Sequence, residues 1–249
     1  MRLSLPGYAR IESPRARGIA LENCRSEIES ILSGETIYDF AARQPDARRF
    51  VGRAPVYAIA LGECSNVVVR RSMRGGVLAS LNTDLFLPPT RGLRELIASL
   101  RLRSVGVATP ELVAFVNYPA GAVLRRSDVV TREIQGDDLG SLLAPAISDE
   151  RRQQALLAAA SLVASLSNAG AHHPDLNLRN ILVDRTEPDR AWVLDVDRIR
   201  FHVPGNPMVI RANADRLERS LRKRRASGEI AIGDDEIASL RARIIGSAT

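Results

Sequence analysis

The sequence predicts an α+β fold in which a sheet-rich first half is followed by a mainly helical second half. Two β-branched runs, at 50–60 and 67–71, are separated by turn residues, and the first of them is itself interrupted by a turn at Gly52. This spacing is typical of a three-stranded antiparallel meander. The second half opens with a long alanine-rich helical pattern and closes with two more helical patterns. The 249 residues suffice for one large domain or one two-lobed domain with a hydrophobic core.

The first half contains further strands and one clear helix. Residues 1–36 are expected to be a weakly structured extension with a mild helical pattern near 22–32. Two strand-like runs are predicted at 112–116 and 122–134. Between the meander and these runs, a helix is predicted from an N-cap at Thr90 to residue 103. Its apolar positions are Leu93, Leu96, Ile97 and Leu100, and Glu95 lies nearly opposite this stripe, which favours a solvated side chain.

The second half is predicted from helix caps and hydrophobic spacing. Ser148 is a good N-cap, with acidic residues following in the first turn, and Gly170 is a natural helix stop. A turn at 204–207 precedes two more helices, at about 209–226 and 234–245. We therefore expect an extension at 1–36, a sheet lobe at 37–133 and a helical lobe at 134–249.

Charge and composition restrict the class of protein. The net charge is +6, and Lys223 is the single lysine among 35 basic residues. This balance favours anionic partners such as nucleotides, phosphorylated sugars or an anionic membrane surface. The first 20 residues lack the continuous apolar core of a signal peptide, and no run is long enough for a spanning helix. Cys24 and Cys64 have neither ligand-like nor framework spacing, so a reducing, cytoplasmic setting is expected.

Three polar residues are expected to meet in the second half. Asp175 lies in a loop, Asn180 enters a short strand, and Asp195 ends the next short strand after a polar turn. Such a hairpin brings two carboxylates and an amide together. This combination suits a phosphate-bound divalent metal and a hydroxyl nucleophile. His173 is expected to serve as a structural hydrogen-bonding residue, and the spacing of His172 and His202 does not suit a metal site.

The order of these elements resembles the protein kinase-like fold. His173, Asp175, Leu176 and Asn180 match the H-x-D-L-x-x-x-N spacing of the kinase catalytic loop, and Asp195 follows at a suitable distance. More narrowly, residues 37–225 are similar to the 3-deoxy-D-manno-octulosonic acid (Kdo) kinase and lipopolysaccharide core kinase family. The matching pieces are Tyr38-Asp39, Gly52-Arg53, Val69-Arg70-Arg71, Arg74-Gly75-Gly76, Leu93-Arg94-Glu95, Val107 with Pro110, 131–136, 195–198 and 216–223.

The resemblance implies ATP-dependent phosphorylation of a Kdo hydroxyl on a lipid A precursor at the cytoplasmic face of the inner membrane. Asp175 would then orient the acceptor hydroxyl and accept its proton. Asn180 and Asp195 would hold Mg²⁺ against the ATP phosphates. In the short stretch after Asp195 there is no room for a long activation segment, which disfavours a protein substrate.

In the sheet lobe, the resemblance assigns the remaining nucleotide contacts. Arg70 stands where protein kinases have a lysine on the third strand, and Glu95 stands where its helix partner lies. The turn at Gly52 would cover the phosphates, and the segment containing Glu133 would contact adenine through its backbone. Arg71 is the alternative to Arg70 for this role. Strand alternation sends the two side chains to opposite faces, so one of them faces the nucleotide.

Two other classes of protein are compatible with parts of the sequence. A pseudokinase or nucleotide-binding regulator is suggested by Arg70 in place of lysine and by Ala54 in place of a second glycine after Gly52. A nucleic-acid-binding protein is suggested by the arginine content, but few aromatic residues and no reader motif are present, so no nucleic acid is expected as a partner. Asp175 and Asn180 also suit ordinary turns. The identity of the acceptor sugar is not fixed by the sequence.

Overall fold

The computed structural model describes residues 5–50, 54–73, 84–86 and 91–247 and divides the chain into two compact units. The first unit consists of Met1–Leu96 and Glu111–Glu133, and the second of Ile97–Pro110 and Ile134–Thr249. The predicted sheet and helical lobes differ from these units at one segment. Residues 97–110, expected in the sheet lobe, belong to the second unit, because the later half of helix α3 packs into the core of that unit.

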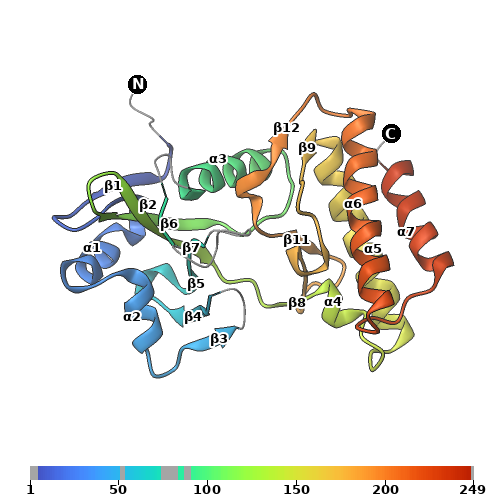
Figure 1. Cartoon of the computed structure of the whole chain (residues 1–249), viewed down its shortest axis with the longest axis horizontal. Helices are drawn as coiled ribbons and strands as arrows, with labels where there is room; N and C mark the ends of the chain where they lie inside the picture. Colours follow the sequence, from blue (N-terminus) through green and yellow to red (C-terminus); the bar gives the residue numbers. More distant parts are fainter. Residues whose placement is uncertain (1–4, 51–53, 74–83, 87–90, 248–249) are drawn as a thin grey trace. The chain divides into compact units, whose positions relative to one another are not determined.

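The first unit is built on an antiparallel sheet of seven strands in the order β1-β2-β6-β7-β5-β4-β3 (Figure 1). The strands are β1 (Tyr8–Glu12), β2 (Arg17–Leu21), β3 (Arg48–Phe50), β4 (Val56–Ala60), β5 (Asn66–Arg71), β6 (Leu112–Ala120) and β7 (Leu124–Arg132). The central strands are the most apolar: the first five residues of β6 are all buried, whereas all three residues of the edge strand β3 are exposed. This gradient is expected, because a central strand has a neighbour on each side.

Residues 5–36 are an integral part of this unit, so the expectation of a weakly structured extension is wrong. Strands β1 and β2 form a hairpin that joins the sheet through β2 and β6, with Ala20 opposite Ala114. Helix α1 (Arg25–Gly34) buries Ile28 and Leu32 in the core of the unit, and α2 (Ile37–Arg43) follows. The partners of this hairpin lie about ninety residues along the chain, so local patterns do not reveal the pairing.

Helix α3 (Arg91–Ser104) confirms the predicted helix but not its predicted buried face. The N-cap expected at Thr90 lies outside the described residues. The buried side chains include Glu95, Leu96, Ser99 and Leu102, whereas Ile97 is 45% exposed. The buried face is therefore rotated from the apolar stripe and includes an acidic residue.

The second unit is mainly helical. Its elements are α4 (Leu139–Leu142), α5 (Asp149–Asn168), α6 (Pro207–Ala226) and α7 (Asp234–Gly246), with the short strands β8 (Gly136–Asp138), β9 (Ala171–His172), β10 (Ile181–Asp184), β11 (Ala191–Val193) and β12 (Arg200–Phe201). Figure 1 shows α5, α6 and α7 side by side, and their apolar faces share one core with β10 and β11. Ser148 caps α5 by accepting the Arg151 N–H, as predicted.

Four 3-10 turns, η1 (Glu22–Cys24), η2 (Gly62–Cys64), η3 (Leu178–Asn180) and η4 (Val196–Arg198), complete the described structure. Two of them, η3 and η4, carry or follow polar residues singled out from the sequence. Among the described helices, none has the length and apolar character needed to cross a membrane.

Candidate active site

The second unit places Asp175, Asn180 and Asp195 around one hydrogen-bonded ring. We call residues 173–180 the Asp175 loop. The Asn180 side-chain Nδ2 donates to the Asp175 carbonyl oxygen at 3.0 Å, and the Asn180 carbonyl accepts the Leu194 N–H at 2.9 Å. The Leu194 carbonyl lies 3.1 Å from His173 Nε2, and this contact closes the ring of hydrogen bonds at the Asp175 loop. The ring holds Asp175 and Asn180 together and brings Leu194, the residue before Asp195, beside them.

Local structure explains how the loop is held. Strand β9 pairs with β12, so the loop begins at a fixed point, and β10 pairs with β11 where the loop ends. Asn177 caps the turn η3 by accepting the Arg179 N–H, and its Nδ2 donates to the Asp175 carbonyl at 2.7 Å. The Asp175 carbonyl thus accepts two amide donors, and the backbone on either side of the carboxylate is fixed.

His173 is a structural residue, as expected. Its side chain is fully buried, and burial lowers the pKa of its imidazole, partly offset by the Leu194 carbonyl. A neutral ring can donate from Nε2 to that carbonyl. The base of the site is therefore not this histidine, because its ring is buried and its Nε2 is engaged with the Leu194 carbonyl.

Asn213 holds the start of the Asp175 loop, and the sequence analysis missed it. It lies in α6 with no exposed surface, and its Oδ1 accepts the His173 backbone N–H at 3.0 Å. Its Nδ2 donates to Ser167 Oγ at 3.0 Å and to the Ala171 carbonyl at 2.9 Å. The sequence could have indicated this role, because Asn213 is a polar residue on the apolar face of α6, next to Ala214 and one turn from Leu217.

The Asp175 carboxylate forms an ion pair with Arg198. Arg198 thereby reaches back to the loop. The turn η4 projects Arg198 from just beyond Asp195. A guanidinium group therefore lies beside the Asp175 carboxylate.

Asp195 adopts a conformation that is unusual for a non-glycine residue. Its φ is 56° and its ψ is 51°, in the left-handed region, which costs on the order of 1 kcal/mol for such a residue. Its side chain is exposed and has no ion pair with a described residue. In the same part of the structure, the Asn180 Oδ1 accepts no hydrogen bond from a described residue. Mg²⁺ prefers oxygen ligands and takes several of them from phosphates and water, so this donor set fits it.

In the first unit, Arg70 and Glu95 form an ion pair. Arg70 lies on β5, and Glu95, on α3, has only 6% of its side chain exposed. The solvated glutamate favoured by periodicity is therefore wrong, and the pairing implied by the family resemblance is present. The Glu95 Oε2 is buried without a hydrogen-bond partner among the described residues.

Arg71 points to the opposite side of β5 and serves another purpose. Its Nε donates to Asp128 at 3.1 Å, its NH2 donates to Thr36 at 3.1 Å, and its guanidinium stacks over the Tyr38 ring at 4.3 Å. The Asp128 side chain has no exposed surface, and burial raises its pKa against the lowering effect of Arg71. Of the two arginines, Arg70 is the one beside Glu95.

The other two residues expected to contact a nucleotide have different outcomes. The Glu133 carboxylate pairs with Arg48 at 2.5 Å, and its N–H donates to the Asn66 carbonyl at 3.0 Å. Its carbonyl oxygen accepts no hydrogen bond from a described residue. Gly52 lies outside the described residues.

Comparison with known proteins identifies relatives. The model of the lipopolysaccharide kinase (Kdo/WaaP) family matches residues 47–241. A protein named 3-deoxy-D-manno-octulosonic acid kinase from Vibrio parahaemolyticus is 29% identical over 69% of this chain and 71% of its own length. A protein of the same name from Xylella fastidiosa strain M12 is 30% identical, covering 66% of this chain and 65% of its own length.

A solved structure shares the fold. The structure described as WaaP in complex with acyl carrier protein matches with a TM-score of 0.53 at 16% identity, covering 97% of this chain and 88% of that chain. The α+β kinase-like fold predicted from the sequence is thereby confirmed.

Proposed function

This chain belongs to the lipopolysaccharide kinase (Kdo/WaaP) family, and we propose that it transfers the terminal phosphoryl group of ATP to a hydroxyl of Kdo. Family membership makes it a kinase with a sugar hydroxyl as acceptor. The relatives that carry the name Kdo kinase support this choice of sugar. The observation that carries the proposal is the hydrogen-bonded ring that joins Asp175 to Asn180 and to Leu194, the residue before Asp195.

The second unit supplies the groups that act on the acceptor. The acceptor oxygen attacks the γ-phosphorus, the bond from that phosphorus to the β–γ bridging oxygen breaks, ADP leaves, and the hydroxyl proton passes to Asp175. Arg198 holds the Asp175 carboxylate and places positive charge beside the reacting oxygen. Asn180 and Asp195 would hold Mg²⁺, which when bound neutralises developing charge on the phosphates.

The first unit supplies contacts to the nucleotide. Arg70 would hold ATP phosphates, and arginine suits this role because its guanidinium binds phosphate through two parallel hydrogen bonds. Glu95 fixes the direction of Arg70. The Glu133 carbonyl is proposed to contact adenine, and the turn at Gly52 to cover the phosphates.

An ATP phosphotransfer assay with free Kdo and a panel of neutral sugars tests this function. Asp175→Asn is expected to lower kcat by about 10²- to 10⁴-fold, the usual contribution of a positioned base, with little change in KM for ATP. Chelating Mg²⁺ with EDTA is expected to abolish transfer. The matched control is Asp189→Asn, which removes the same charge from an exposed residue whose side chain accepts a hydrogen bond from Gln154.

Two outcomes would contradict the proposal. If the wild type transfers no phosphate to any sugar, the chain is better described as a nucleotide-binding regulator with a kinase-like fold. If Asp175→Asn and Asp189→Asn have equal activity, the assignment of the base is wrong.

We also propose that the chain associates with the cytoplasmic face of the inner membrane, where a lipid-linked acceptor would be found. The support is its net charge of +6. Sedimentation with anionic phosphatidylglycerol vesicles is expected at low salt and is expected to disappear in 0.5 M salt, where the Debye length falls to about 4 Å. Equal sedimentation with neutral phosphatidylcholine vesicles would contradict an electrostatic association.

A further inference from the structure

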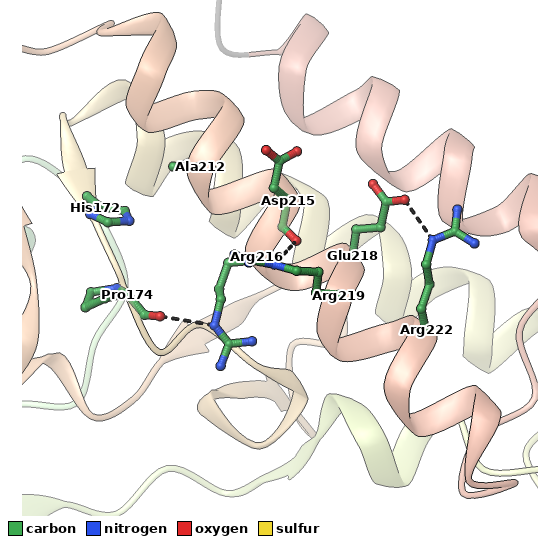
Figure 2. Close-up of a pocket in the computed structure, with 8 residues that line it drawn as sticks. All are labelled: His172, Pro174, Ala212, Asp215, Arg216, Glu218, Arg219 and Arg222. Atoms are coloured by element: carbon green, nitrogen blue, oxygen red, sulfur yellow. Dashed lines mark hydrogen bonds and ion pairs between the residues drawn. The ribbon is translucent and has the colours of Figure 1, made fainter.

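A hollow of about 620 Å³ lies between α6 and the start of the Asp175 loop. Figure 2 shows its lining residues, which come from α6, the end of β9 and the start of the Asp175 loop: His172, Pro174, Ala212, Asp215, Arg216, Glu218, Arg219 and Arg222. The volume is within the range of about 300–1,000 Å³ that is usual for small-molecule sites. Pro174 directly precedes Asp175, so the hollow adjoins the residue proposed to accept the acceptor's proton.

The charges around the hollow do not cancel. Its two carboxylates are both taken: Asp215 pairs with Arg241, and Glu218 pairs with Arg241 at 3.1 Å and with Arg222 at 2.9 Å. Arg222 also pairs with Asp234 at 2.9 Å. Arg216 and Arg219 form no ion pair with any described residue. The hollow therefore carries two uncompensated guanidinium groups.

Arg216 is held in place without using its terminal nitrogens. Its Nε donates to the Pro174 carbonyl at 3.0 Å, and Figure 2 shows the guanidinium turned toward the loop. Among the described residues, its two terminal NH₂ groups have no acceptor, although the side chain is partly buried. Arg219 is held in a similar way, because its Nε donates to the Asp215 backbone carbonyl at 3.2 Å. Each arginine is thus oriented by a neutral carbonyl and keeps its full charge.

His172 adds a neutral polar group to the same wall. Burial, followed by the nearby His202 and Arg200, lowers the pKa of its imidazole. A neutral ring contributes one hydrogen-bond donor and one acceptor, which suits hydroxyl groups and not a second anion. The hollow therefore combines fixed cations with a hydroxyl-binding group.

We infer that this hollow is the acceptor subsite and that Arg216, assisted by Arg219, binds the carboxylate of a sugar acid there. The planar guanidinium matches a carboxylate in a two-bond arrangement. This inference rests on the proposed function and adds to it the place of the acceptor and the residue that holds its carboxylate. Arg216 donates a hydrogen bond to the carbonyl of Pro174, which directly precedes Asp175. The position of the bound sugar carboxylate is therefore linked to the position of Asp175.

The test is a double-mutant-type cycle that removes the sugar's negative charge, the Arg216 guanidinium, or both. Binding of free Kdo and of its methyl ester, which lacks the negative charge, is measured by calorimetry on the wild type and on Arg216→Gln. The wild type is expected to bind the acid about tenfold or more tightly than the ester, as charge-assisted hydrogen bonds are among the strongest. In Arg216→Gln this preference is expected to fall to less than about threefold. Arg216→Lys should recover part of it.

The control is Arg211→Gln, the same substitution on the same helix at an exposed residue outside the lining of the hollow. It is expected to keep the wild-type preference for the acid. If Arg216→Gln weakens acid and ester equally, Arg216 only supports the loop and the inference is overturned. It is also overturned if acid and ester bind the wild type equally while inorganic phosphate displaces both, since the site would then prefer phosphate.

Phosphotransfer measured on the same samples separates this inference from the proposed function. A wild type that transfers phosphate to both acid and ester with equal KM overturns the subsite alone. A wild type that prefers the acid through Arg216 but transfers nothing overturns the kinase assignment alone. The absence of both binding and transfer overturns both.

Discussion

At the scale of single residues, Arg70 and Arg71 show how one strand divides two similar side chains between different tasks. Successive residues of a strand point to opposite faces. On one face Arg70 meets Glu95, and on the other Arg71 meets Asp128 and Thr36. The first pair leaves Glu95 Oε2 without a hydrogen-bond partner in the described part of the chain, whereas the second is enclosed in a network that joins α2 to the sheet.

Matched lysine substitutions separate these tasks. Arg70→Lys is expected to keep folding stability within about 0.5 kcal/mol and to retain phosphotransfer, because lysine can still pair with one carboxylate oxygen. Arg71→Lys is expected to lower the free energy of unfolding by about 1–3 kcal/mol, because one ammonium cannot replace both hydrogen bonds and the stacking on Tyr38. Urea unfolding and KM for ATP measure the two effects. A loss of activity at unchanged stability in Arg71→Lys would reverse the assignment.

At the scale of elements, the turn between α5 and β9 sets where the Asp175 loop begins. Gly170 ends α5 with a φ of 70°, which favours glycine. A Cβ at this position would lie 2.5 Å from the His202 carbonyl oxygen and 2.8 Å from that of Val203. The Gly170 carbonyl also accepts the His202 N–H at 2.8 Å. The glycine is therefore required both by its backbone angle and by close packing against the chain before α6.

Alanine substitutions at two glycines isolate the packing contribution. Gly228 has a φ of 72°, but a Cβ there meets nothing within 4 Å. Gly228→Ala is expected to cost about 1 kcal/mol, the strain of the left-handed conformation alone. Gly170→Ala is expected to cost about 2–4 kcal/mol, because backbone atoms must also move. Equal midpoints in urea unfolding for the two variants would show that the chain at 202–203 moves aside without cost.

At the scale of the whole molecule, the buried histidine of the Asp175 loop links folding to pH. His173 is enclosed by the second unit, and burial lowers the pKa of its ring. Below the unfolded value of about 6.5, the unfolded chain gains a proton at this residue that the folded chain does not take up. Its contribution to stability is therefore complete above about pH 6.5 and is lost as the pH falls toward the lower folded pKa.

The free energy of unfolding is accordingly expected to decrease between pH 7 and pH 5, with a slope of up to about 1.4 kcal/mol per pH unit for each histidine involved. His172, whose pKa burial also lowers, contributes with the same sign. Urea unfolding at a series of pH values measures the slope, and His173→Gln is expected to reduce it. A wild-type stability that rises on acidification through this range would show that His173 is protonated in the folded state.

The sequence by itself determined the features that depend on nearby residues. The helices α5, α6 and α7 were predicted from caps and spacing, and Asp175, Asn180 and Asp195 were predicted to converge because one short hairpin connects them. Such features need only local turns and periodicity.

The tertiary structure alone decided the features that depend on distant partners. The hairpin of β1 and β2 joins the sheet through residues far along the chain, the buried Glu95 of α3 pairs with an arginine of strand β5, and Asn213 supports the Asp175 loop from a helix forty residues later. Burial of a polar side chain is favourable only when a specific partner satisfies it. That partner is set by packing, so no local pattern identifies it.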